Sequence, residues 1–244
     1  NDTSFGVAYA PLSPREQLTL SLANYLNSKN VTKKYPWLGK DLKVMTLRKG
    51  ATIYVTVALA FLDKFIQNID DYFRAKEEVR RAIESYLQTK FDFKSVVVAL
   101  NVLDAPQAQT ASDVYLTCTG LSAEQGDDGE VGRGNRIDGL ITPLRQMTLE
   151  AASGKNINHP GKLYQVLAQV IAQKVGKLEG VEECYVKLLS QIGQPLDEPQ
   201  IALVELKAQN FSQVKVEATR ICEETLNQVA KIQRAIIQGK YQLF

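Results

Sequence analysis

Residues 42–61 read LKVMTLRKGATIYVTVALAF, and the fold of the first half of the chain follows from them. Residues 42–47 and 53–61 are largely apolar and rich in β-branched side chains, which is typical of strands. Between them, Arg48, Lys49 and Gly50 form a short basic segment that ends in a residue suited to a turn. These features predict a β-hairpin.

Helices flank this hairpin. Ser13 followed by Pro14 is typical of a helix start, and apolar residues then recur at helical spacing up to Leu26. A Lys- and Asn-rich loop carrying Trp37 follows. Residues 69–89 form a second amphipathic pattern, and residues 95–102 and 114–119 are typical of strands.

The second half repeats this alternation. Residues 161–177 and 213–238 predict helices, and residues 181–191 and 201–206 predict strands. Helices packed on mostly antiparallel strands are typical of the α+β class. We expect two α+β units, residues 1–118 and 119–244.

The composition excludes several classes of protein. The chain has 29 Lys and Arg against 27 Asp and Glu, so it lacks the cationic excess of a nucleic-acid-binding protein. No apolar run approaches the roughly 18 residues of a membrane span, so we expect no membrane partner. Cys118, Cys184 and Cys222 are scattered, which fits a reducing compartment better than a disulfide framework or a zinc site. We expect a cytoplasmic protein.

Residues 120–139 are rich in glycine and charge: GLSAEQGDDGEVGRGNRIDG. Glycine lets the backbone approach a ligand closely, and successive N–H groups can then hold an anion. Arginine binds phosphate through two parallel hydrogen bonds, and carboxylates bind hydroxyl groups, ammonium groups or magnesium. A solvated surface loop is the alternative, and composition alone does not separate the two.

A basic segment precedes the helix predicted at 161–177. Residues 151–162 read AASGKNINHPGK and bring Lys155, His159 and Lys162 close to a helix N-terminus, where phosphate binds favourably. The spacing is not that of a Walker loop. A basic loop with Gly161 as its turn, and a structural role for His159, remain alternatives. Asp2 lies either at the mouth of a buried strand or in a simple cap.

These segments, taken in order, resemble the archaeal-type S-adenosylmethionine synthetases. The family strings are matched by NDTSFGVAYAPLS at 1–13, TGLSAEQGDDGEVGRGNR at 119–136, GLITP at 139–143, AASGKN at 151–156 and LSQIG at 189–193. The resemblance covers the whole chain. Because the chain begins at Asn1, inside a family motif, we expect that it lacks an N-terminal portion of the family.

The resemblance implies a three-domain α+β fold with pseudo-threefold symmetry, and a homodimer with active sites at the subunit interface. It implies ATP and L-methionine as substrates, Mg²⁺ and in many relatives K⁺ as cofactors, and residues 1–10 as part of the active-site core. In the implied reaction the methionine sulfur displaces tripolyphosphate from the ATP 5′ carbon. The tripolyphosphate is then split to diphosphate and phosphate.

The family's functional residues carry over as follows. Asp2 and Asp127 match substrate-binding acids, Asp127 holding the methionine ammonium group, and Ile192 matches an apolar position beside the nucleotide base. Arg133 and Lys155 match catalytic residues of the family that contact the polyphosphate. His159 stands where distant relatives have a second lysine, and we expect it to share this catalytic role.

Two departures limit this transfer. The turn at 48–52 lacks an Asp-Lys pair common among relatives, and Gly161 stands near the position of a bacterial magnesium-binding acid. No metal ligand is therefore assigned.

Three functions remain open at this stage. We expect a methionine adenosyltransferase, inactive as the isolated chain because the absent portion supplies metal ligands and phosphate contacts. A non-catalytic nucleotide-binding regulatory subunit and a purely structural interaction module are the alternatives. The first reading requires the segments around Asp127 and Lys155 to meet around a triphosphate.

Overall fold

The computed structural model describes residues 2–121, 137–149, 152, 155–241 and 243. The fold is α+β, as expected, and the chain divides into two compact units. One unit contains Ser13–Gly129, and the other contains Asn1–Leu12 with Glu130–Phe244.

In the 13–129 unit, helices pack on one face of a four-stranded sheet. Its elements are α1 (Pro14–Leu26), α2 (Lys29–Lys34), β2 (Leu38–Lys49), β3 (Thr52–Leu62), η1 (Asp63–Phe65), α3 (Ile69–Lys90), β4 (Ser95–Leu100), η2 (Ala111–Asp113) and β5 (Leu116–Thr117). The predicted hairpin is confirmed, since β2 and β3 pair antiparallel from Leu42↔Leu59 to Lys49↔Thr52. Ser13 caps α1 in a capping box with Glu16.

Strand β4 pairs parallel with β3, which the sequence did not indicate. The connection from β3 to β4 contains α3, whose length of 22 residues lets the chain return to the starting edge of the sheet. Alternate residues of β3, such as Ile53, Val55 and Val57, are buried beneath the helices. The period-2 pattern of the strand therefore decides which face becomes the core.

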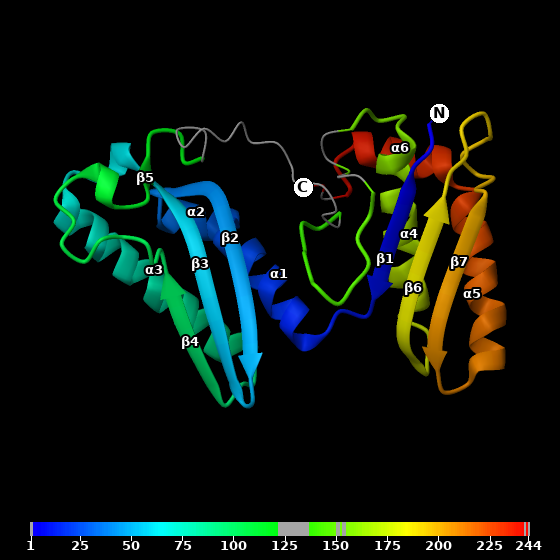
Figure 1. Cartoon of the computed structure of the whole chain (residues 1–244), viewed down its shortest axis with the longest axis horizontal. Coiled ribbons are helices and arrows are strands. Elements are labelled where there is room, and N and C mark those ends of the chain that lie inside the picture. The colour runs from blue at the N-terminus through cyan, green and yellow to red at the C-terminus, as the bar shows by residue number, and fades with distance from the viewer. Residues whose placement is uncertain (1, 122–136, 150–151, 153–154, 242, 244) are drawn as a thin grey trace. The chain divides into compact units, whose positions relative to one another are not determined.

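The second unit contains an antiparallel sheet in the order β1-β6-β7 (Figure 1). Its elements are β1 (Phe5–Ala10), α4 (Pro160–Val175), β6 (Val181–Leu189), β7 (Ile201–Ala208), α5 (Phe211–Leu226) and α6 (Val229–Ile237). Helix α4 packs on β1 and β6, and α5 packs on β7. The core of this unit lies between these helices and the sheet.

Helix α4 lies directly on the backbone of β1. A Cβ atom on Gly6 would lie 2.5 Å from the carbonyl carbon and oxygen of Tyr164, so only glycine fits there. All described residues from Pro160 to Ala168 are buried. This close approach fixes the first turns of α4 against the start of the sheet.

Three features differ from the sequence expectations. The segment expected to be a loop contains α2, and the single helix expected at 213–238 is two helices, broken at Asn227–Gln228. Strand β1 belongs to the second unit, because it pairs with β6 from Phe5↔Leu189 to Ala10↔Cys184. The division of the chain is thus discontinuous, whereas we expected a boundary at 118/119.

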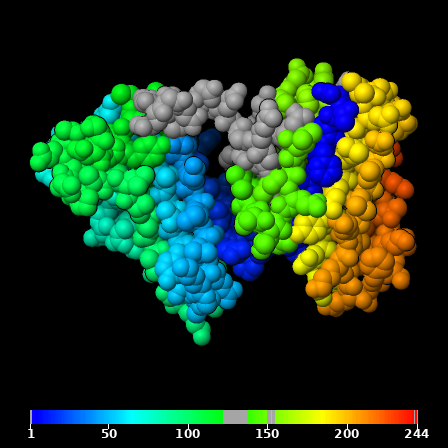
Figure 2. Space-filling model, viewed as in Figure 1, coloured from blue at the N-terminus to red at the C-terminus, as the bar shows by residue number. Residues whose placement is uncertain are grey.

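In each unit, part of the sheet face that points away from the helices lies at the surface. In Figure 2 yellow and orange atoms of β6 and β7 form part of the surface of one unit, and light-blue atoms of β2 and β3 form part of the surface of the other. In the 13–129 unit, Leu47, Tyr54 and Val97 lie in one row across three strands and are 39–47% exposed.

No helix in the described part of the chain is both long and apolar enough to cross a membrane. The three cysteines are free thiols.

Candidate functional site

The start of β1 is fixed to the end of β6 by Ser190. This residue is 2% exposed, and its hydroxyl accepts a hydrogen bond from the Ser4 amide at 2.7 Å. The same hydroxyl donates to the Asp2 carbonyl at 2.9 Å, and the Ser190 amide donates to the Ser4 carbonyl at 2.9 Å. The backbone of residues 2–4 is therefore held, while the Asp2 side chain remains 61% exposed.

His159 brings the start of α4 to the same place. It is the N-cap of α4, and its Nδ1 accepts a hydrogen bond from the Gly161 amide at 3.0 Å. Because Nδ1 is an acceptor, a neutral ring carries its proton on Nε2. That nitrogen lies 3.7 Å from Oδ2 of Asp2. Two predicted site residues that are far apart in the sequence are thus neighbours.

Lys162 occupies the first turn of α4 and is only 8% exposed. Burial lowers the pKa of its ammonium group, because the charged form loses hydration. The positive end of the helix dipole is also unfavourable for a cation. Lys162 therefore places a positive charge in the first turn of α4, and phosphate binds favourably at a helix N-terminus.

The remaining described site residues lie in segments next to these. Lys155 is half-buried in the segment that leads to His159, and its amide donates to the Ala152 carbonyl at 3.4 Å. Ile192 follows Ser190 closely in the chain and is 63% exposed. An exposed apolar side chain at this position is accessible to a flat, apolar ligand group.

A segment before Lys155 is fixed to the sheet by Arg145. Its guanidinium group lies 3.6 Å from the centre of the Tyr9 ring and donates hydrogen bonds to the hydroxyls of Tyr185 at 2.5 Å and Tyr9 at 2.8 Å. Thr148 accepts a buried hydrogen bond from Gln165 of α4 at 2.8 Å. These contacts restrict the path of the chain toward the basic segment.

Asp127 and Arg133 lie outside the described residues, so their predicted roles stay predictions. In the part of the chain that the structure describes, no group of three or more His, Cys, Asp and Glu side chains could hold a metal ion. Asp2 offers one carboxylate at the site.

This end of the second unit combines an accessible carboxylate, a capped helix N-terminus and two lysines. Such a set suits a ligand that carries both a cationic and a polyanionic group. The family model described as S-adenosylmethionine synthetase (AdoMet synthetase) matches residues 1–240. The chain belongs to the S-adenosylmethionine synthetase family.

Curated relatives agree with this assignment. The S-adenosylmethionine synthase of Methanocaldococcus jannaschii is 45% identical over 248 residues, which are 100% of this chain and 60% of the relative. That of Thermococcus onnurineus is 45% identical over 249 residues, and a probable S-adenosylmethionine synthase of Aquifex aeolicus is 43% identical over 244. The chain therefore spans about 60% of the length of these relatives.

A solved structure supports the fold. The S-adenosylmethionine synthetase of Campylobacter jejuni matches 93% of this chain and 60% of its own, with a TM-score of 0.60 at 12% sequence identity. At that identity the likeness concerns the fold only.

Ser190 and Arg145 hold the segments around the candidate site, and the sequence analysis gave neither a role; Lys162 was named there only as one of three cations before the predicted helix. Ser190 lies within the LSQIG string and Lys162 lies within the basic segment, so the sequence contained a pattern that pointed to each of them. Arg145 follows the GLITP string, but nothing local indicates its contacts with Tyr9 and Tyr185.

Proposed function

We propose that the whole protein is a methionine adenosyltransferase that converts ATP, L-methionine and water to S-adenosylmethionine, phosphate and diphosphate. The observation that carries the proposal is the family match over residues 1–240. The proximity of Asp2 to His159 at the start of α4 supports it independently of any alignment.

The proposed chemistry suits the residues present. A neutral thioether sulfur has a free electron pair and attacks the 5′ carbon without a general base. The carbon–oxygen bond to tripolyphosphate breaks, and water then splits the tripolyphosphate. What the protein must supply is alignment of sulfur and carbon, together with stabilisation of a highly charged leaving group.

We assign these roles to residues as follows. Arg133, Lys155 and His159 bind the polyphosphate, and the buried ammonium group of Lys162 adds a positive charge beside them. Asp127 holds the methionine ammonium group, Asp2 binds methionine or adenosine, and Ile192 packs beside the base. Residues 1–10 thereby contribute to the active-site core.

Magnesium, with potassium as a second cation, completes the proposal. Mg²⁺ commonly takes one or two protein carboxylates together with substrate phosphates and water. Asp2 is assigned to methionine or adenosine, so no protein ligand of the ion is assigned among the described residues. The ion would neutralise charge on the polyphosphate.

We also propose a cytoplasmic homodimer with its active sites at the subunit interface. The row of Leu47, Tyr54 and Val97 supports dimerisation, since an apolar sheet face at the surface is typical of an interface. In a twofold dimer the same face would serve both copies.

The activity can be measured directly. S-adenosylmethionine formation from ATP, methionine and magnesium should be negligible with residues 1–244 alone and substantial with a chain of the relatives' full length. Substantial turnover by residues 1–244 would refute the predicted inactivity. An inactive full-length protein would favour the regulatory-subunit alternative.

A measurement of ATP binding distinguishes a purely structural module from the enzyme and from the regulatory subunit. Calorimetry with ATP should show saturable binding that is lost on combined Arg133→Ala and Lys155→Ala substitution. Absence of binding to the unsubstituted protein would favour the structural alternative.

A further inference from the structure

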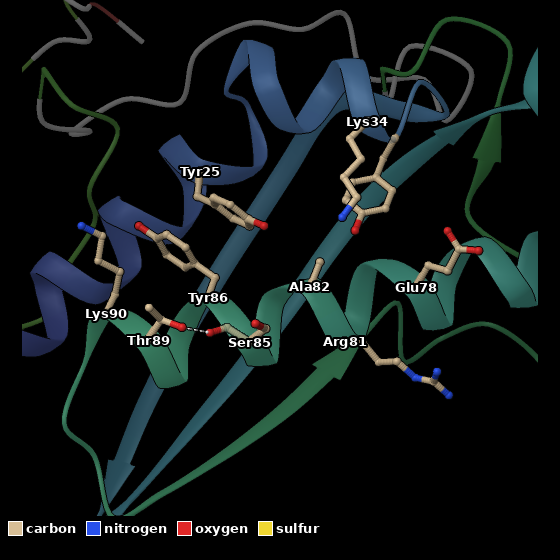
Figure 3. Close-up of a pocket in the computed structure, with 10 residues that line it drawn as sticks. Tyr25, Lys34, Glu78, Arg81, Ala82, Ser85, Tyr86, Thr89 and Lys90 are labelled. Carbon is tan, nitrogen blue, oxygen red and sulfur yellow. Dashed lines mark hydrogen bonds between the residues drawn. The ribbon is translucent and has the colours of Figure 1, made fainter.

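A cavity of about 480 Å³ opens between the helices of the 13–129 unit. It is lined by Tyr25 of α1, by Lys34 and Tyr35 at the end of α2, and by one side of α3 from Glu78 to Lys90 (Figure 3). Its volume is within the range of small-molecule sites. None of these residues is assigned to ATP or methionine.

Two tyrosine rings form a fixed wall of the cavity. Tyr25 and Tyr86 stack with their centres 4.0 Å apart and their planes 13° from parallel. The Tyr86 hydroxyl bonds to the Ser21 hydroxyl and donates to the Ser21 carbonyl at 3.3 Å. Because the pair is already ordered, a ligand ring that packs on it incurs little additional loss of conformational entropy.

A cation and hydroxyl groups meet beside this wall. Nζ of Lys34 lies 5.0 Å from the centre of the Tyr35 ring. In Figure 3 the Lys34 ammonium group and the Tyr25 hydroxyl point into the same space near Ala82. Hydrogen bonding to the Tyr35 hydroxyl raises the pKa of Lys34, and a lysine is charged at neutral pH even without such a rise.

The charge around the cavity favours an anion. Lys34, Arg81 and Lys90 are the cations of the lining, and Glu78 is its one acid. Arg81 bonds to Glu77 at 2.8 Å and points away from the cavity (Figure 3). Lys34 is exposed and lies closest to the tyrosine hydroxyls, so it is the expected anion contact.

We propose that this cavity binds a small organic anion that carries a planar ring and a phosphate group. The ring packs against the Tyr25–Tyr86 pair. The phosphate oxygens accept hydrogen bonds from the Lys34 ammonium group and from the hydroxyls of Tyr25 and Tyr35. Charge-assisted hydrogen bonds of this kind are the strong ones, so Lys34 contributes most to affinity.

Phenyl phosphate is the simplest probe, and Trp37 is a built-in reporter. It is the chain's single tryptophan, and its ring lies 5.6 Å from that of Tyr35. Titration with phenyl phosphate should change Trp37 fluorescence saturably, also in the presence of tripolyphosphate and magnesium, which lack a ring and occupy the polyphosphate site. Inorganic phosphate and phenol should each bind more weakly, because each lacks one half of the ligand.

Lys34→Gln and Lys33→Gln are a matched pair. Both remove one charge from α2, but Lys33 does not line the cavity. Lys34→Gln should weaken binding about tenfold, the typical loss for one charge-assisted hydrogen bond, and Lys33→Gln should leave it within twofold. The proposal is overturned if both variants weaken binding alike, if Lys34→Gln binds as the parent does, if tripolyphosphate with magnesium displaces the probe, or if no saturable change occurs.

Discussion

At the scale of single residues, Gly6 determines how closely α4 can approach β1. Gly6→Ala would place a Cβ atom 2.5 Å from the Tyr164 backbone, which cannot move without the whole helix. We expect a loss of about 2–3 kcal/mol in the free energy of unfolding, as for an overpacked core, measured by urea denaturation. Gly50→Ala is the control: it has φ +58° and open space around it, and it should cost only about 1 kcal/mol. Equal costs would mean that close packing at Gly6 is unimportant.

Substitutions of Asp2 and Ser190 distinguish a residue that binds substrate from a residue that stabilises the fold. Asp2→Asn removes an exposed charge, so in the full-length protein the KM for a substrate should rise about tenfold while the melting temperature stays constant. Ser190→Ala leaves the buried Ser4 amide without its 2.7 Å acceptor, so it should lower the free energy of unfolding by about 1–3 kcal/mol. Steady-state kinetics and thermal unfolding of both variants test the distinction. An unchanged KM in Asp2→Asn would remove Asp2 from the site.

At the scale of elements, Asp104 joins α3 to the segments after β4. Its carboxylate is 3% exposed and accepts hydrogen bonds from Lys76 at 2.6 Å, the Tyr72 hydroxyl at 2.8 Å and the Tyr115 amide at 3.0 Å. Asp104→Asn leaves a largely buried ammonium group without its counter-charge, and we expect a loss of about 3 kcal/mol. Glu77→Gln on the exposed side of α3 should cost less than about 1 kcal/mol. Urea denaturation that gave similar values for both variants would contradict the role of this network.

Elements with strong local signals could be predicted. Ser13 caps α1 as its side chain suggests. Gly50 lies in the turn of the hairpin, whereas Arg48 and Lys49, expected between the strands, belong to β2 and pair with Ile53 and Thr52. Helix α2 was missed because it has six residues and one buried side chain, Val31, which is too short to show a period. The break between α5 and α6 has neither proline nor glycine, so the apolar period continues across it in the sequence.

Contacts between distant segments could not be predicted locally. The pairing of β1 with β6 is invisible in either strand alone, and so is the 3.7 Å approach of His159 to Asp2. Family resemblance assigned both residues, but only the packing of α4 on Gly6 accounts physically for their meeting. Lys162 was noticed as a cation, whereas its burial depends on the folded core.

At the scale of the whole molecule, the exposed sheet face bears on assembly. Tyr54 lies in register between Leu47 and Val97, at the centre of the apolar row. Tyr54→Asp should convert a full-length dimer to monomer and reduce activity, because it removes the central aromatic ring of the row and places a carboxylate, which is costly to bury, in the interface. Phe65→Asp, which changes an aromatic residue of similar exposure in η1, should do neither. Sedimentation equilibrium that showed both variants as dimers would contradict the proposed interface.

The central claim is that Arg133 and the basic segment before α4 bind the triphosphate of ATP. Calorimetric titration of residues 1–244 with tripolyphosphate and magnesium tests it most directly. Combined Arg133→Ala and Lys155→Ala substitution should weaken binding at least tenfold, whereas the charge-matched Arg48→Ala and Lys49→Ala pair at the end of β2 should not. Binding that is unchanged by the first pair, or weakened equally by both, would contradict the claim.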